Sequence, residues 1–182
     1  MLAWGNHCRP AHRLYILRTF MLEHLAKLIS NSSLTEWIQT EYWLWPILEI
    51  AHFLGLTLLL GGLIIIDLRM LGFFRNINLQ ATHKIIPIVI MGFSLNLVTG
   101  VLFFYGDPMR YSVNIGFQIK MVLILIAGLN AAVYHLKSKD LLRSAEPNGF
   151  PDYRTRLVAS ISLSSWCGVL LLGRLIPYVG TG

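Results

Sequence analysis

Ionisable side chains stand inside or at the edges of the long apolar stretches of this sequence, and they are its best candidates for chemistry. They are Glu49, His52, Asp67, His83, Lys120, His135 and Arg174. A charged group in the middle of a membrane costs roughly 2.5 kcal/mol or more, so such residues usually serve a site or a partner. Imidazole is a common ligand of haem iron, and a neighbouring carboxylate can orient it. The candidate chemistry is therefore cofactor binding inside a membrane.

The surroundings of two histidines favour a flat cofactor. Glu49 and His52 are spaced i, i+3 and share a helix face, so the carboxylate is expected to fix the imidazole tautomer. Gly55 lies on the stripe of His52, and Gly128 lies on the stripe of His135. Small residues beside a histidine leave room for a macrocycle in a helical bundle, although they also simply let helices pack closely.

Depth along the helices sorts the candidates. We name side A the membrane face at which the first apolar run begins, and side B the opposite face. With the helical rise, His52 lies about 14 Å from side A, Glu49 about 9 Å, Arg174 about 8 Å and Lys120 about 5 Å. These four residues are expected to form one polar cluster in the side A half.

The same arithmetic leaves two haem arrangements open. His52 and His135 differ in depth by roughly 14 Å, which is awkward for two ligands of one iron. One arrangement uses His52, alone or with Lys120. The other uses His83 with His135 near side B, unless His83 is a solvated group at the lipid headgroups and Lys120 a snorkelling anchor.

Arg174 has two readings as well. With Tyr178 one turn further on, it is placed to bind a haem propionate or the head group of a quinone. Alternatively, Arg174 pairs with Glu49, which would lower the cost of burying both charges.

The composition defines the class of protein. Of the 182 residues, 55% are hydrophobic and 13% charged, whereas a soluble domain has about 25% charged residues. This excludes a disordered chain and favours a membrane protein. The formal charge of +6 comes from short segments between apolar runs, a distribution that does not indicate nucleic acid. No hydrolase, kinase or dinucleotide motif and no C-x-x-C-H haem attachment site is present.

Four segments are long and apolar enough to cross a membrane as helices. They cover residues 43–66, 85–105, 117–136 and 157–179. The sequence therefore predicts an all-α fold, an integral membrane four-helix bundle formed by residues 43–182. Residues 21–42 alternate apolar and polar positions and predict an amphipathic helix in the membrane interface. Residues 1–20 are expected to be a mobile arm or to precede a start at Met21.

Basic residues in the loops predict the orientation. Side B carries eight, namely Arg69, Arg75, Lys84, Lys137, Lys139, Arg143, Arg154 and Arg156. From Met21 onward, side A carries four, namely Lys27, Arg110, Lys120 and Arg174. The positive-inside rule places side B in the cytoplasm and both termini on the periplasmic side. Residues 1–20 would raise the side A count to seven and weaken this assignment.

A set of short motifs carries a family resemblance. It comprises Trp45-Pro46-Ile47-Leu48-Glu49-Ile50-Ala51-His52-Phe53-Leu54-Gly55, Gly61-Gly62, Asp67-Leu68-Arg69, Gly92-Phe93, Thr99-Gly100, Phe117, Lys120, Asn130, His135, Trp166, Gly173-Arg174 and Tyr178. From about residue 43 onward, the chain resembles a family of uncharacterised bacterial four-span membrane proteins. More remotely, it is similar to the membrane domain of copper resistance protein D and to the HemJ-type protoporphyrinogen oxidases.

The HemJ-type proteins have a first-span histidine, a glycine-rich stretch after it and a lysine that opens the third span. His52, Gly61-Gly62 and Lys120 match this layout, and the pattern departs at Glu49 and His135. The resemblance implies b-type haem held near His52 and Lys120, in a protein of the bacterial inner membrane.

The sequence thus predicts a small b-type cytochrome that carries electrons between a quinone and a partner subunit. His52 is the first expected iron ligand, and Lys120 or His135 is the second. The expected partners are the lipid bilayer and either a redox protein or a second copy of the chain. Two alternatives stay open: a cofactor-free anchor or assembly subunit, and a porphyrinogen-oxidising or copper-handling protein.

Overall fold

The computed structural model describes residues 24, 26–74, 83–143, 152–176 and 178. The side chains of residues 83, 135 and 137–143 lie outside this description, as does the predicted arm at residues 1–20. All regular structure within the described residues is helical. The predicted all-α class is confirmed.

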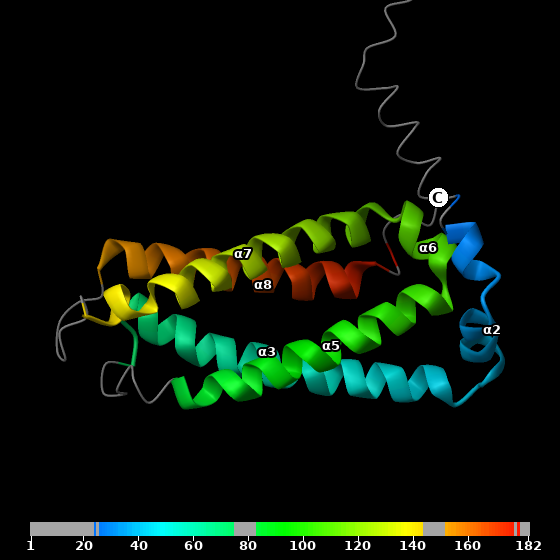
Figure 1. Cartoon of the computed structure of the whole chain (residues 1–182), viewed down its shortest axis with the longest axis horizontal. Coiled ribbons are helices and arrows are strands. Elements are labelled where there is room, and N and C mark those ends of the chain that lie inside the picture. The colour runs from blue at the N-terminus through cyan, green and yellow to red at the C-terminus, as the bar shows by residue number, and fades with distance from the viewer. Residues whose placement is uncertain (1–23, 25, 75–82, 144–151, 177, 179–182) are drawn as a thin grey trace, which may run out of the picture.

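Four long helices make up the body of the molecule (Figure 1). They are α3 (Leu44–Leu71), α5 (Ile86–Gly106), α7 (Ile115–Arg143) and α8 (Tyr153–Leu175). Each is long and apolar enough to cross a membrane, which confirms the predicted four spans. α3 continues past the predicted end at residue 66 and stops at Gly72, whose φ of 98° is the left-handed conformation that glycine adopts readily.

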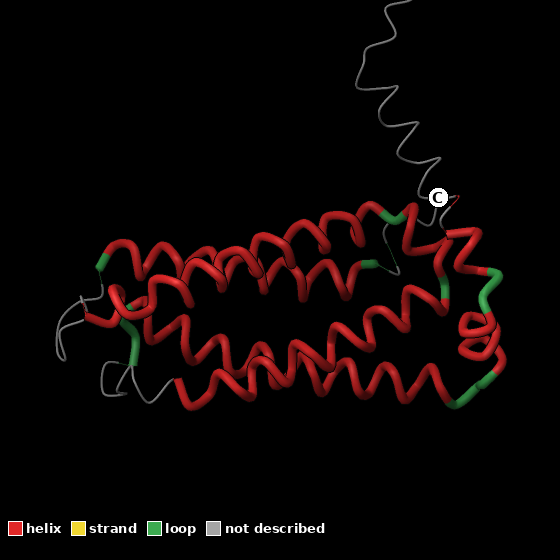
Figure 2. The backbone as a smooth tube through the Cα atoms, in the orientation of Figure 1, coloured by secondary structure: helices red, strands yellow, loops and turns green. Residues whose placement is uncertain are grey.

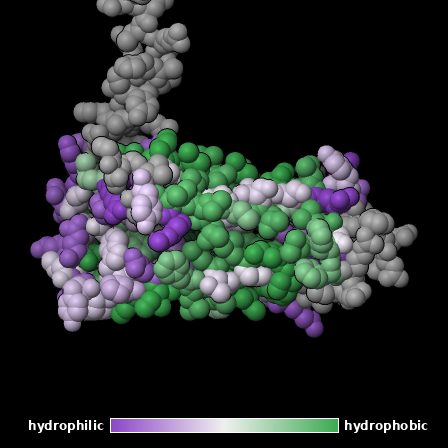
Figure 3. Space-filling view, turned by 180° about the vertical axis from the view of Figure 1, so that it is seen from behind, coloured by the Kyte–Doolittle hydropathy of each residue, from purple (hydrophilic) through white to green (hydrophobic). Residues whose placement is uncertain are grey.

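The surface has the distribution expected of a membrane protein. Hydrophobic residues cover the middle of the face shown in Figure 3, and hydrophilic residues gather at its two ends. Large apolar side chains of the spans, such as Ile90, Leu125 and Leu129, are well exposed. In water such a surface would aggregate, whereas in lipid it is solvated. The chain therefore has the character of a multi-pass membrane protein.

The four helices are arranged as two hairpins. α3 packs along α5, α7 packs along α8, and the hairpins join where α3 meets α8. Figure 1 shows the α7–α8 hairpin lying over the α3–α5 hairpin. Within the described part of the chain, α5 and α7 lack a packed seam of this kind. That difference leaves room for a cavity between the hairpins.

Glycines set the close approach of α3 and α5. A Cβ atom on Gly92 would lie 2.6 Å from the backbone nitrogen of Leu59 and 2.8 Å from the carbonyl oxygen of Gly55. The neighbouring atoms are backbone, so neither can turn away. Small residues at a membrane helix interface allow this proximity and the dispersion contacts that come with it.

We expect Gly92→Ala to destabilise the α3–α5 hairpin by about 1–3 kcal/mol, as overpacking of a close-packed core does. The measurement is thermal unfolding in detergent, and Gly61→Ala is the matched control because a Cβ at Gly61 meets nothing within 4 Å. Equal stability of the two variants would contradict the close approach.

Two short helices cover the side A end of the bundle. These are α2 (Ser33–Thr40) and α6 (Pro108–Val113), and a 3₁₀ turn, η1 (His83–Ile85), precedes α5 at the other end. The Thr35 hydroxyl donates to the Tyr105 carbonyl at 2.9 Å, and the Gln39 amide donates to the Gly106 carbonyl at 2.9 Å. These bonds satisfy carbonyls that the end of α5 leaves without helical partners.

The predicted amphipathic helix of residues 21–42 is interrupted. Helical structure ends at Ser30 and resumes with α2 at Ser33 after a short non-helical link (Figure 2). The Ser32 side chain caps the start of α2 by accepting a hydrogen bond from the Thr35 backbone at 3.2 Å. A serine hydroxyl at a helix N-cap accepts a hydrogen bond from a free backbone N–H group of the first turn, and this favours the start of a new helix there. The apolar side of α2 packs into the bundle through Ile38, which joins a buried cluster with Leu44 and Leu48.

Candidate functional site

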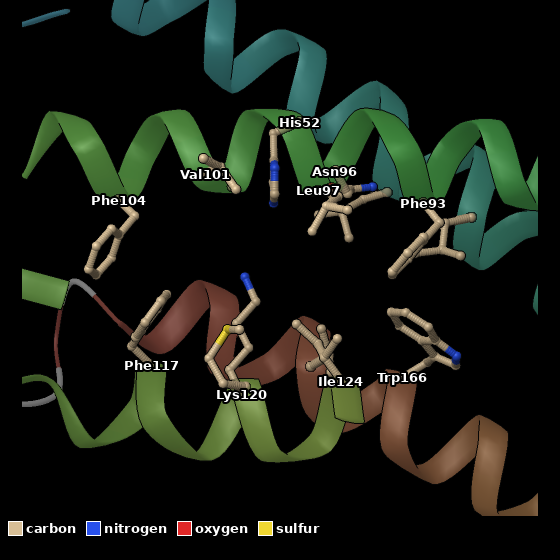
Figure 4. A pocket seen from close by; sticks show the side chains of 15 residues that line it. His52, Phe93, Asn96, Leu97, Val101, Phe104, Phe117, Lys120, Ile124 and Trp166 are labelled. Atoms are coloured by element: carbon tan, nitrogen blue, oxygen red, sulfur yellow. The ribbon is translucent and has the colours of Figure 1, made fainter. Parts of the chain in front are cut away.

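A cavity of about 370 Å³ lies between the two hairpins. Such a volume is within the range of cofactor and ligand pockets. The side chains from α5 and α7 face each other across it, with His52 of α3 on one side and Lys120 of α7 on the other (Figure 4). Almost all other lining groups are apolar or aromatic. The polar side chains that line it are His52, Lys120 and Asn96, and a few polar groups converging on an apolar cavity are the usual plan of a binding site.

The imidazole of His52 is held by a hydrogen bond to a neighbouring helix. Its Nδ1 atom lies 2.7 Å from the hydroxyl of Thr99 on α5. The Thr99 oxygen also lies 2.8 Å from the Leu95 carbonyl of its own helix. When the Thr99 hydroxyl donates to that carbonyl, it accepts from Nδ1, and the other ring nitrogen, Nε2, which points into the cavity (Figure 4), then has a free lone pair. This is the tautomer that a metal ligand requires.

Packing fixes the ring as well. The edge of the His52 imidazole meets Phe103 at a centroid distance of 5.4 Å and an interplanar angle of 71°. Thr99 is only 3% exposed, so its hydroxyl cannot be replaced by water without opening α3 from α5. A ligand held in this way keeps one orientation, which is the function of the groups that surround metal-binding histidines.

Lys120 approaches from the opposite wall. Its amine points across the cavity towards the imidazole of His52 (Figure 4). Gly173 of α8 gives it room, because a Cβ there would lie 3.4 Å from the Lys120 amine and 3.8 Å from its Cε. Within the described part of the chain, this amine makes no hydrogen bond and no ion pair. The expected pairing of His52 with Lys120 in one site thus matches their positions.

Aromatic rings shape the ends of the cavity. Phe93 and Trp166 meet edge to face at 6.2 Å, and Phe104 and Phe117 stack at 5.9 Å with an angle of 20° between their planes. Each pair joins a helix of one hairpin to a helix of the other. The cavity between the pairs is therefore long and bounded by flat faces, a shape that suits a planar molecule.

Gly100 forms part of the same wall and widens it. The residue lines the cavity, and a Cβ built on it meets no atom within 4 Å. The missing side chain therefore contributes directly to the open volume.

Glu49 does not orient His52. Its side chain is exposed and accepts a hydrogen bond from the Trp45 indole at 3.2 Å, one turn earlier on α3. The i, i+3 spacing puts Glu49 and His52 on one side of α3, but the Nδ1 of His52 is already bonded to Thr99. The predicted orienting role of Glu49 is replaced by that of Thr99.

The Glu49 carboxylate instead belongs to the side A rim. Burial raises the pKa of Tyr111 on α6, and the carboxylates of Asp107 and Glu49 add to the rise against the opposing effect of Arg110. Tyr111 in turn packs on Phe117 at 5.3 Å, at the end of the cavity. Glu49 thus acts on the side A end of the bundle and not on the surroundings of the His52 ring.

Arg174 also lies away from the expected four-residue cluster. Its side chain is exposed in the last turn of α8, where a cation is favoured by the helix dipole. The guanidinium lies 6.0 Å from the centre of the Tyr178 ring, and Tyr178 is exposed as well. Of the predicted cluster, His52 and Lys120 line the cavity, whereas Glu49 and Arg174 make their described contacts elsewhere.

The alternative pair at side B is not placed by the structure. His83 begins η1 and His135 lies on the last third of α7, but both side chains lie outside the described part. Their pairing remains a prediction.

Asn130 and Asn96, two asparagines within the spans, form different hydrogen bonds. The Asn130 amide donates to the Val158 carbonyl of α8 at 3.0 Å, an interhelical bond of the kind expected for a mid-span amide. The Asn96 amide instead donates to Gly92 within α5 at 3.0 Å, and its buried oxygen has no hydrogen-bond partner.

Sequence reasoning missed Thr99 as the partner of His52. Threonine in a membrane helix commonly bonds back to its own backbone, as Thr99 does, so its residue type alone gives no signal. The contact joins residues 47 positions apart and depends on the register of α3 against α5.

No family profile, curated protein or solved structure matches the chain. Among the described residues, no three His, Cys, Asp or Glu side chains are grouped to hold a metal ion.

Proposed function

We propose that the protein is a b-type haem protein of the membrane, with His52 as the iron ligand. The observation that carries the proposal is the His52 imidazole, whose Nδ1 is hydrogen-bonded to Thr99 while Nε2 faces an apolar cavity. Neutral imidazole bound through one nitrogen, with its other N–H hydrogen-bonded, is the usual arrangement of a haem-binding histidine.

The donor set favours haem over a bare metal ion. A copper or zinc site needs three or four protein ligands, and the strong nitrogen donors that line the cavity are a single imidazole and a single amine, beside the Met121 thioether and the Asn96 amide. A porphyrin supplies the equatorial nitrogens itself, so one or two protein ligands suffice. Lys120, on the wall opposite His52, is placed to be the second ligand as a neutral amine or to bind an anionic group of the cofactor as an ammonium.

The surroundings of the cavity fit the rest of the cofactor. The flat faces of the Phe93–Trp166 and Phe104–Phe117 pairs provide dispersion contact for a macrocycle. Bound haem would supply one-electron transfer, with a potential set by its ligands and by burial. Arg174 at the side A end is available to an anionic group such as a propionate or to a quinone head group.

Absorption spectroscopy of the purified protein tests the proposal. We expect a Soret band in protein isolated from membranes, or after reconstitution of the colourless protein with hemin. A preparation that stays colourless in both cases would overturn the proposal and favour a cofactor-free anchor or assembly subunit. Turnover of a porphyrinogen by the coloured protein would assign it instead as an oxidase.

Loss of the Thr99 hydroxyl should weaken haem binding through His52. We expect Thr99→Val, which keeps the shape of the side chain, to reduce hemin affinity by about 10–100-fold and to shift the midpoint potential, as loss of such supporting groups does. Thr99→Ser retains the hydroxyl and should restore both properties. The measurements are hemin titration and potentiometry, and a Thr99→Val variant that behaves like the parent would exclude the orienting role.

A further inference from the structure

Asp67 is a buried carboxyl that the proposed haem site does not use. It lies on α3, 15 residues after His52 and therefore about 22 Å further along the helix, towards side B. Only 4% of its surface is exposed. The position next to Ile66 and one turn before Met70 places it beside an apolar cluster that these residues form with Ala159 of α8.

The hydrogen bonding of Asp67 is incomplete. The Ser162 hydroxyl of α8 hydrogen-bonds to the carboxyl group, and the buried Oδ2 atom has no hydrogen-bond partner. A carboxylate has room for about four hydrogen bonds and is costly to bury without them or a cation. A carboxylic acid carries no charge and is far cheaper to bury.

Among the described side chains, those that pack around Asp67 do not supply a positive charge. From α8 it meets Ser162 and the apolar Ala159, and from α7 the cluster is bordered by Tyr134. The neighbouring part of η1 and α5 contributes Ile85, Ile86 and Val89, while Lys84 is exposed. Arg69 lies two positions along α3 and so points to another side of the helix. Of the side chains that pack against this apolar cluster, Tyr134 is the one that can titrate, and its phenol is uncharged at neutral pH.

We propose that Asp67 is a proton-binding site that clamps the two hairpins together. In the neutral form, the carboxyl rests between α3 and α8 and bonds to Ser162. When its proton passes to water at side B, the carboxylate has to gain hydration, and the α3–α8 seam loosens. The α3–α8 contact is the packed contact between the two hairpins. The tightness of this contact therefore determines the distance between α5 and α7.

The seam is directly connected to the cavity. Trp166 lies one turn after Ser162 on α8, and it forms the cavity wall together with Val169. A movement of α8 against α3 therefore carries Trp166 away from Phe93 and widens the cavity. Proton binding at Asp67 would in this way regulate access to the cavity from the bilayer.

Infrared spectroscopy of the protein in lipid vesicles tests the proton site. We expect a carboxylic acid C=O band at neutral pH that is lost in Asp67→Asn and lost from the parent on alkaline titration. Asp152→Asn is the matched control, because Asp152 is an exposed N-cap of α8 whose carboxylate accepts from the Tyr153 backbone at 2.8 Å. A band unchanged in Asp67→Asn would overturn the proposal.

Spin-label distances test the clamp. Labels at Val98 of α5 and Val122 of α7, both exposed, report the separation of the hairpins once Cys8 and Cys167 are replaced with serine. We expect the distance to increase at alkaline pH in the parent and to stay short in Asp67→Asn, whose amide is uncharged at every pH. A pH response that persists in Asp67→Asn would refute the clamp. Both measurements follow Asp67 and the helix separation directly and can be read whether or not haem is bound, so the clamp and the proposed haem function can fail separately.

Discussion

Protein carrying His52→Ala should be isolated without a Soret band and should fail to regain one with hemin. The reason is that His52 is the imidazole whose free nitrogen faces the cavity, with its other nitrogen bonded to Thr99. An axial ligand provides the directional bond to the iron, and the apolar walls contribute only non-directional contact. The absorption spectrum and a pyridine haemochrome assay of equal amounts of protein give the measurement.

Other histidine variants make this result specific. His24→Ala removes an exposed imidazole at the side A end and should leave the band intact. His135→Ala tests the competing ligand near side B and should also leave it intact. If His52→Ala keeps the full band while His135→Ala loses it, the iron lies near side B and the His52 assignment is wrong.

Lys120→Met tests whether Lys120 is a second iron ligand or an anchor. We expect the variant to keep haem but to show an altered absorption spectrum if Lys120 is the second ligand.

The spans were predictable from the sequence because a membrane imposes one strong rule. Backbone groups in lipid must bond within their own segment, so about 20 apolar residues in a row predict a helix. Two of the helices exceed the predicted lengths, α3 by continuing to Leu71 and α7 by continuing to Arg143, because hydropathy marks the lipid-embedded part and not the helix end. The break at Asn31–Ser32 depends instead on one capping side chain, Ser32.

The candidate site was predictable only in part. His52 and Lys120 were selected because charged or titratable groups are rare in membrane spans, and both line the cavity. Their depth along the helix could be computed, but the direction in which each side chain points depends on helix rotation, which hydropathy does not determine. For this reason depth alone predicts Glu49 and Arg174 in one polar cluster with His52, although both side chains lie at the surface. Thr99 and Gly100 needed the packed structure.

Filling the cavity from Gly100 should abolish hemin binding while raising stability. A Cβ at this position meets no protein atom within 4 Å, so the leucine of Gly100→Leu can enter the cavity without pushing a neighbour aside. Leucine would occupy space that a macrocycle needs, and its contacts would join α5 to α7. Filling a cavity commonly stabilises a protein by about 0.5–2 kcal/mol.

The opposite signs of these two effects make Gly100→Leu informative. A variant that merely misfolds loses haem and stability together, whereas a filled cavity loses haem and melts at a higher temperature in the absence of hemin. Gly61→Leu is the control, since its Cβ also meets nothing within 4 Å but Gly61 is an exposed residue of α3 outside the cavity lining. Hemin titration and thermal unfolding of the three proteins give the result. Normal hemin binding by Gly100→Leu would place the cofactor outside this cavity, even if His52→Ala is colourless, because a leucine and a macrocycle cannot share the space between α5 and α7.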